Sequence, residues 1–84
     1  MKALCDARTK AVAANIRRTR EIRNYTQDYL AAKLSISQNA YSKIELGYSN
    51  ITLNRLLCIA DILEIDVAEL LSIDHSNQLR KAAV

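Results

Sequence analysis

One local pattern recurs along the middle of this 84-residue chain and constrains its fold more than any other feature. An apolar residue is followed at once by Thr, Ser or Asp, and a second apolar residue comes four positions after that polar one. In this order the polar side chain caps a helix and the two apolar side chains pack over the cap as a hydrophobic staple. The pattern occurs at Tyr25-Thr26 with Leu30, Ile36-Ser37 with Tyr41, Ile51-Thr52 with Leu56, and Ile65-Asp66 with Leu70.

The composition also favours an all-α domain. The chain has no proline and one glycine, and only 5% of its residues are aromatic, whereas strand-rich folds need turn residues and aromatic or β-branched runs. A first helix is expected from a cap at Thr9 or Asp6 to about Arg23. Asn24 and Gly47 should end helices, because both residue types tolerate the left-handed backbone conformation. The other helices are predicted over residues 27–34, 38–46, 53–63 and 67–72.

The three-residue break Ser35-Ile36-Ser37 between two of these helices is typical of a helix-turn-helix unit. Ala31 and Ala32 supply the small residues needed where the second helix crosses the first. The expected inward side chains are Leu30, Leu34, Ile36, Tyr41 and Ile44. Because the linkers are short, neighbouring helices must pack on one another. Residues 1–72 are therefore predicted to form one domain, followed by a C-terminal tail over residues 73–84.

The helix over residues 38–46 leaves one side free of core residues. On a wheel of about 100° per residue, an arc of roughly 140° holds Gln38, Asn39, Ser42, Lys43 and Leu46. The first turn of a recognition helix enters the major groove. There Gln or Asn can bridge adenine N6 and N7, and Lys can reach guanine or a phosphate. Predicted base contacts are Gln38, Asn39, Ser42 and Lys43; the alternative is an ordinary polar helix surface.

Phosphate contacts are predicted at two neighbouring places. Gln27 is at the first position of its helix, where unpaired backbone N–H groups attract a phosphate; its side chain would touch that phosphate or brace Gln38. The second place is the region before and at the start of the helix over 53–63. Its candidate residues are Tyr48, Ser49, Asn50, Asn54 and Arg55. The alternative is that these are plain loop and cap residues.

Charge is unevenly distributed along the chain. Residues 1–55 hold ten Lys/Arg and four Asp/Glu, a net charge of +6, whereas residues 56–84 hold two and five, a net charge of −3. A basic first part with an acidic end indicates a surface that faces a polyanion and a separate face for another purpose.

Residues 16–71 resemble the Cro/repressor-type, or Xre-like, helix-turn-helix family. The resemblance is carried by the stretches IRRTREIRNYTQDYLAAKL, SISQNAYSKIELG and NITLNRLLCIADILEIDVAELL. It implies a compact five-helix, lambda-repressor-like domain that binds operator DNA, usually as a dimer. By position it implies base reading by Gln38, Asn39 and Lys43 and a phosphate contact at Gln27. It also implies an ion pair between the first and third helices, formed by Arg20 and Glu45.

The chain departs from the family pattern at four positions. Ser35 and Glu64 stand where glycine is usual, and a left-handed residue other than glycine costs roughly 1–2 kcal/mol. Ile51 replaces a common proline, and Tyr41 replaces a smaller aliphatic residue. These departures bear on local geometry and on the packing between the two helices of the unit, and none removes a DNA-contact position.

The helix over residues 53–63 is apolar nearly all round, which is typical of a helix buried on more than one side. One side is expected to join the core with Leu30, Ile44 and Leu70. The other is predicted to form a two-fold dimer interface around Cys58, Ile62 and Ile65. A dimer of this kind places two recognition helices about 34 Å apart, one turn of DNA. The alternative is that the C-terminal tail covers this side.

Several classes of function find little support in the sequence. Cys5 and Cys58 lack metal-ligand spacing, and His75 is the sole histidine, so we expect no metal, no cofactor and no enzymatic activity. No apolar run has the length of a membrane span, and the start lacks a signal-peptide core, which predicts a cytoplasmic protein associated with the nucleoid.

The function predicted from the sequence is that of a transcriptional regulator of repressor or controller type, a homodimer that binds palindromic double-stranded DNA. One alternative is an antitoxin-like module that sequesters a protein partner through its C-terminal region. Another is the binding of single strands by base stacking on tyrosines, namely Tyr25, Tyr29, Tyr41 and Tyr48.

Overall fold

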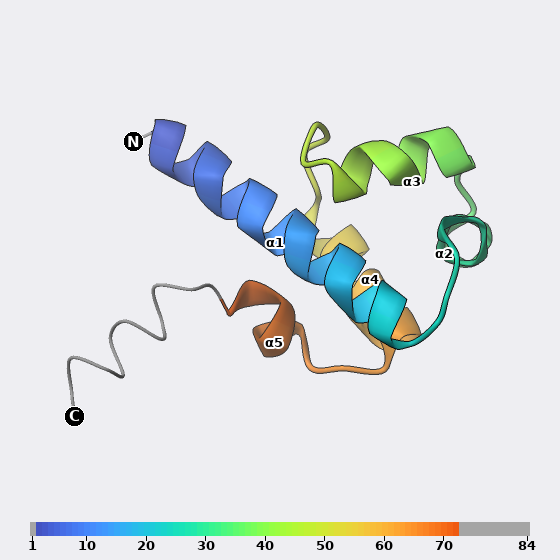
Figure 1. Ribbon diagram of the computed structural model, residues 1–84. Coiled ribbons are helices and arrows are strands. Elements are labelled where there is room, and N and C mark those ends of the chain that lie inside the picture. Colours follow the sequence, from blue (N-terminus) through green and yellow to red (C-terminus); the bar gives the residue numbers. More distant parts are fainter. Residues whose placement is uncertain (1, 73–84) are drawn as a thin grey trace, which may run out of the picture.

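Each of the four repeated signals begins a helix in the computed structural model, which describes residues 2–72 (Figure 1). The side-chain oxygens of Thr26, Ser37 and Thr52 each accept the backbone N–H three residues on. Asp66 accepts that of Ala68. The described helices are α1 (Lys2–Ile22), α2 (Gln27–Leu34), α3 (Gln38–Glu45), α4 (Leu53–Leu63) and α5 (Val67–Leu71). The expected all-α, five-helix, lambda-repressor-like fold is confirmed.

The prediction for the start of the first helix was wrong. Helix α1 begins at Lys2, and neither Thr9 nor Asp6 caps it. Thr9 lies inside the helix, where its hydroxyl donates to the carbonyl of Cys5, 2.9 Å away. The residues before Thr9 are mainly good helix formers and include no glycine or proline, so nothing stops the helix from extending backwards. The predicted bounds of the other helices agree with the structure to within one residue.

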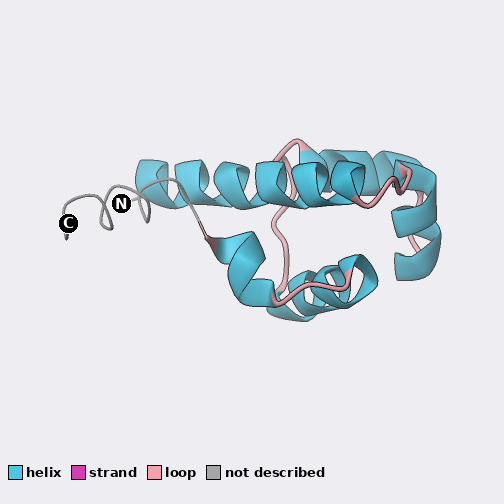
Figure 2. Ribbon diagram, turned by 60° about the horizontal axis from the view of Figure 1, so that its bottom comes forward, coloured by secondary structure: helices cyan, strands magenta, loops and turns pink. Residues whose placement is uncertain are grey.

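Helix α1 runs the length of the molecule, and the other helices pack around its C-terminal half (Figures 1 and 2). Helices α3, α4 and α5 contact it directly, and α2 joins through α3 and α4. The core takes residues from every helix: Ile16, Leu30, Ala31, Tyr41, Ile44, Leu56, Ile59, Ala60, Leu63 and Leu70. Within residues 2–72, no helix is both long and apolar enough to cross a membrane.

Helices α1 to α4 all end in the same way. The residue after each helix is left-handed or leads into a left-handed residue: Asn24 (φ 62°), Ser35 (58°), Gly47 (78°) and Glu64 (60°). At each end, the N–H of this residue and the next one bond back to carbonyls of the last turn. This is the Schellman arrangement, which satisfies carbonyls that a helix end otherwise leaves unpaired. The helix ends predicted at Asn24 and Gly47 are confirmed.

Replacing Ser35 with Gly should stabilise the domain, because glycine adopts this φ without the steric cost of a Cβ atom. The greater freedom of glycine in the unfolded chain offsets part of the gain. We expect the free energy of unfolding to rise by about 0.5–1 kcal/mol, which raises Tm by several degrees in a domain of this size. Thermal unfolding followed by circular dichroism measures it. Ser35→Ala keeps the Cβ and should show no gain; an equal Tm for Ser35→Gly and the wild type would contradict the prediction.

Candidate nucleic-acid interface

Helices α2 and α3 form the helix-turn-helix unit around a small buried residue. Ala31 is buried in α2 where α3 crosses, whereas Ala32 is exposed and does not contribute to the crossing. Tyr41 and Ile44 dock α3 onto the core. Ile36, in the turn, is half-buried against the same core. The crossing places α3 at the edge of the molecule, with one side against the core and the other facing outward (Figure 1).

The outward side of α3 carries the predicted base-contact residues. Gln38, Asn39 and Lys43 are exposed, and Ser42 is half-buried. Leu46, which follows the helix on the same side, is 52% exposed and is the apolar member of this surface. The structure therefore brings these side chains together on one face, which we call the reading face: Gln38, Asn39, Ser42, Lys43 and Leu46.

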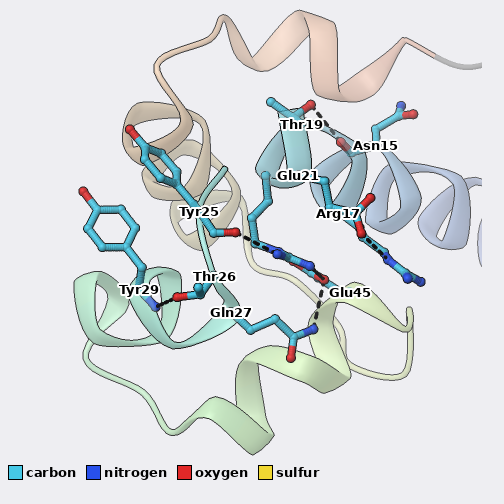
Figure 3. Close-up of polar contacts among 10 residues, drawn as sticks. Asn15, Arg17, Thr19, Glu21, Tyr25, Thr26, Gln27, Tyr29 and Glu45 are labelled. Atoms are coloured by element: carbon cyan, nitrogen blue, oxygen red, sulfur yellow. Dashed lines mark hydrogen bonds and ion pairs between the residues drawn. The ribbon is translucent and has the colours of Figure 1, made fainter. Parts of the chain in front are cut away.

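A buried ion pair ties α3 to α1. Nε of Arg20 donates to Oε2 of Glu45 over 2.6 Å, and Nη2 donates to Oε1 over 3.1 Å. Nη1 of Arg20 also donates to the carbonyl of Tyr25, 2.8 Å away (Figure 3). The Glu45 side chain is only 2% exposed and that of Arg20 11%, so a two-pronged, charge-assisted interaction of this kind is weakly screened by solvent.

Gln27 completes this cluster from the start of α2. Its amide Nε2 donates to Oε1 of Glu45 at 3.1 Å (Figure 3), so it braces Glu45 and not Gln38. Burial alone would raise the pKa of Glu45, but the interactions with Arg20, then Tyr41 and then Gln27, outweigh it, and this pKa lies below its ordinary value. We call Arg20, Gln27 and Glu45 the Glu45 cluster; it joins three helices.

Tyr41 lies beside the Glu45 cluster and is fully buried. Its hydroxyl has no hydrogen-bond partner among the described residues. Burial, followed by the polar interaction with the neighbouring Glu45 carboxylate, raises the pKa of this hydroxyl. The larger side chain noted in the sequence is therefore accommodated in the core, with its hydroxyl beside the Glu45 carboxylate.

A second group of predicted contacts surrounds a hollow beside α3. Ser49, Asn50 and Arg55 line it together with Thr52, and Ala40 and Ile44 form its α3 wall; its volume is about 190 Å³. Tyr48 is 75% exposed in the same loop. Asn54 is exposed but does not line the hollow. We call this feature the loop hollow. Its polar side chains can donate hydrogen bonds to a phosphate, and the nearby start of α4 favours negative charge.

The residues predicted for a dimer interface are only partly at the surface. Cys58 is exposed, but Ile62 and Ile65 are half-buried and pack against the core. The exposed apolar residues in this region are instead Leu53 (71%) and Leu57 (43%) of α4, with Leu71 (49%) of α5. Because α4 is apolar on nearly all sides, its sequence pattern alone does not reveal which leucines face outward.

The remaining sequence candidates are placed as follows. Cys5 and Cys58 are free thiols, both exposed. The rings of Tyr25 and Tyr29 pack together with centroids 4.6 Å apart, and Lys33 lies over the Tyr29 ring. Residues 2–72 contain no group of three potential metal ligands. His75 and the tail over residues 73–84, to which a partner contact was assigned, lie outside the described residues.

A bihelical unit of this geometry, with an exposed second helix, is the arrangement that helix-turn-helix proteins use to bind DNA. A model of the helix-turn-helix family matches residues 16–70, well over half of the chain, and the chain belongs to this family, in its Cro/C1-type, Xre-like form. The protein is a DNA-binding helix-turn-helix regulator. Searches of curated proteins and of solved structures gave no match.

The Glu45 cluster predicts a pH dependence of stability. The pKa of Glu45 is lower in the folded chain than the unfolded value of about 4.3. The contribution of Glu45 to the free energy of unfolding is therefore complete above that pH. It is lost as the pH falls through the folded pKa. Glu45→Gln should cost roughly 3 kcal/mol near neutral pH, and the gap from wild type should narrow in acid. Urea unfolding from neutral to acidic pH measures both.

The control for this prediction is the exposed pair between Arg17 and Glu21, one turn apart on α1. Glu21→Gln removes a carboxylate with a 3.3 Å partner, yet both side chains are more than half exposed, so the cost should stay below about 0.5 kcal/mol. If Glu45→Gln cost no more than Glu21→Gln at neutral pH, the Glu45 cluster would not hold α3 in place.

Proposed function

We propose that this protein is a sequence-specific transcriptional regulator of repressor or controller type that binds a palindromic operator as a homodimer. The observation that carries the proposal is the contrast between the two sides of α3. Its inner side is held by buried side chains and by the Glu45 cluster, while Gln38 and Asn39 are exposed with no role in packing. Amides in the first turn of a fixed, outward-facing helix suit base recognition.

In this proposal the reading face enters the major groove. Gln38 and Asn39 each have a donor and an acceptor for adenine, and each good bidentate contact discriminates by roughly 1–3 kcal/mol. Lys43 reaches guanine or a phosphate, and Ser42 contacts a base edge. Leu46 adds an apolar contact suited to the methyl group of thymine.

Phosphates on either side of the groove set the position of α3. The N-terminal N–H groups of α2, beside Gln27, face one strand. The loop hollow, with Arg55 on its wall, receives a phosphate of the other together with neighbouring Tyr48 and Asn54. Phosphate contacts set register and supply affinity, whereas the reading face supplies sequence preference.

The dimer uses the outward side of α4 and the α4–α5 junction. Cys58 and the half-buried Ile62 and Ile65 form part of it, and the exposed Leu53 and Leu57 extend the apolar area. A two-fold axis here gives each recognition helix its own half-site, so the operator is a palindrome with half-sites one turn apart.

Selection of binding sites from random duplex DNA tests the reading face. The wild type should enrich a palindrome. Gln38→Ala should relax the preference at one position of each half-site, with a loss of roughly 1–3 kcal/mol for the preferred base. Arg55→Ala, the matched control, should weaken binding to all sequences about equally. An unchanged motif with Gln38→Ala would refute the base contact, and the absence of any enriched motif would favour a protein-interaction module.

Sedimentation equilibrium at micromolar concentration tests the dimer. The wild type should sediment as a dimer, and Leu57→Asp should shift it to monomer, because a charge buried at an apolar interface is costly. Leu4→Asp changes a comparably exposed leucine on α1, outside the interface, and should leave the dimer intact. A wild-type monomer under these conditions would contradict the proposed assembly.

A further inference from the structure

The first two-thirds of α1 lies outside the part of the chain that the family model matches. The helix begins at Lys2, whereas the family match begins at residue 16. These additional turns run past the C-terminal end of α3 and the loop that follows it, and their start projects beyond the other helices (Figures 1 and 2). Residues 2–15 therefore lie beside the edge of the proposed DNA-binding surface.

This part of α1 packs tightly against the turn after α3 at Gly47. A Cβ atom on Gly47 would lie 2.8 Å from Cγ of Lys10 and 3.3 Å from its Cα. Such distances leave no room for a side chain, so the turn after α3 rests directly on the stem of Lys10. Tyr48 and Ser49, two of the predicted phosphate contacts, follow this turn immediately.

The charged end of Lys10 is available to an external partner. The residue is exposed, and the ion pairs among residues with described side chains do not include it. By contrast, Arg17, which lies about two turns further along the same side of α1, is paired with Glu21. Asp6 is one turn before Lys10 and is exposed to solvent.

We propose that Lys10 contacts a DNA phosphate next to those bound by the loop after α3, so that α1 extends the contact with the DNA backbone beyond the family's domain. The inference rests on the proposed DNA-binding function. The stem of Lys10 is held against Gly47 from Cα to Cγ, so its exposed ammonium group extends from a point beside the loop. A lysine in this position binds as a point charge and reads no sequence.

A purely structural role for Lys10 makes a different prediction. The C-terminal end of α3 carries partial negative charge, and a nearby ammonium group would stabilise it. Loss of that interaction would lower Tm without changing how DNA binding depends on salt. The salt dependence therefore separates the two roles.

The test compares Lys10→Gln with Arg8→Gln. Arg8 is two residues earlier on the same helix and about 160° around it, and it is also exposed. Each variant lowers the net charge by one, and glutamine keeps the Cγ atom that rests on Gly47. Affinity for a random-sequence duplex pool is measured against salt concentration. Lys10→Gln should reduce the magnitude of the slope of log K against log salt by about 0.9, the value expected for the loss of one phosphate contact. Lys10→Arg should restore the slope. Arg8→Gln should have the same slope as the wild type.

The outcomes distinguish the inference from the function on which it rests. If the wild type fails to bind duplex DNA, the proposed function fails. If the wild type binds but both glutamine variants keep its slope, the function stands and the Lys10 contact is wrong, as it also is if Lys10→Gln changes Tm alone. An equal reduction in both variants would reflect net charge and would likewise overturn the specific contact.

Discussion

The position of α3 depends on the buried pair between Arg20 and Glu45. A helix of eight residues is unstable in isolation, so α3 owes its structure and its orientation to contacts with the rest of the domain. The pair brings a residue of α1 to one of α3, and Gln27 adds a third bond from α2. Burying a carboxylate is costly unless such partners surround it. With all three in place, the reading face has a defined direction relative to the start of α2 and the loop hollow.

Four helices in the described residues 2–72 end at a left-handed residue, and only one of these residues is glycine. Asn24, Ser35 and Glu64 are exposed, so each carries only the backbone cost of a left-handed residue with a Cβ atom. Gly47 differs, because its turn lies on Lys10 and a Cβ atom there would collide. The single glycine of the chain is thus at the one of these helix ends where the residue is left-handed and a neighbouring side chain also leaves no room for a Cβ atom. The same close approach holds Lys10 beside the proposed phosphate contacts.

Sequence reasoning succeeded where the signal is local. A cap and a staple lie within six consecutive residues, and these signals located the starts of α2 to α5. It failed at the start of α1, because Thr9 has the chemistry of a cap but bonds to Cys5 inside a helix whose earlier residues also favour helix. The side of α3 that faces outward also followed from periodicity, since Tyr41 and Ile44 are buried opposite the reading face, although Ala40 on their side is exposed. The base and phosphate contacts themselves remain predictions.

What the sequence by itself determined is the helical class of the fold, the helix-turn-helix unit and the residues that can form the reading face. These follow from capping and periodicity, which act between residues close together in the chain. Tertiary structure decided which side of α4 is buried, that Gln27 bonds to Glu45, and that Lys10 lies against Gly47. The physical reason is that each of these depends on a partner far away in sequence, and only the packing of the helices determines which partners meet.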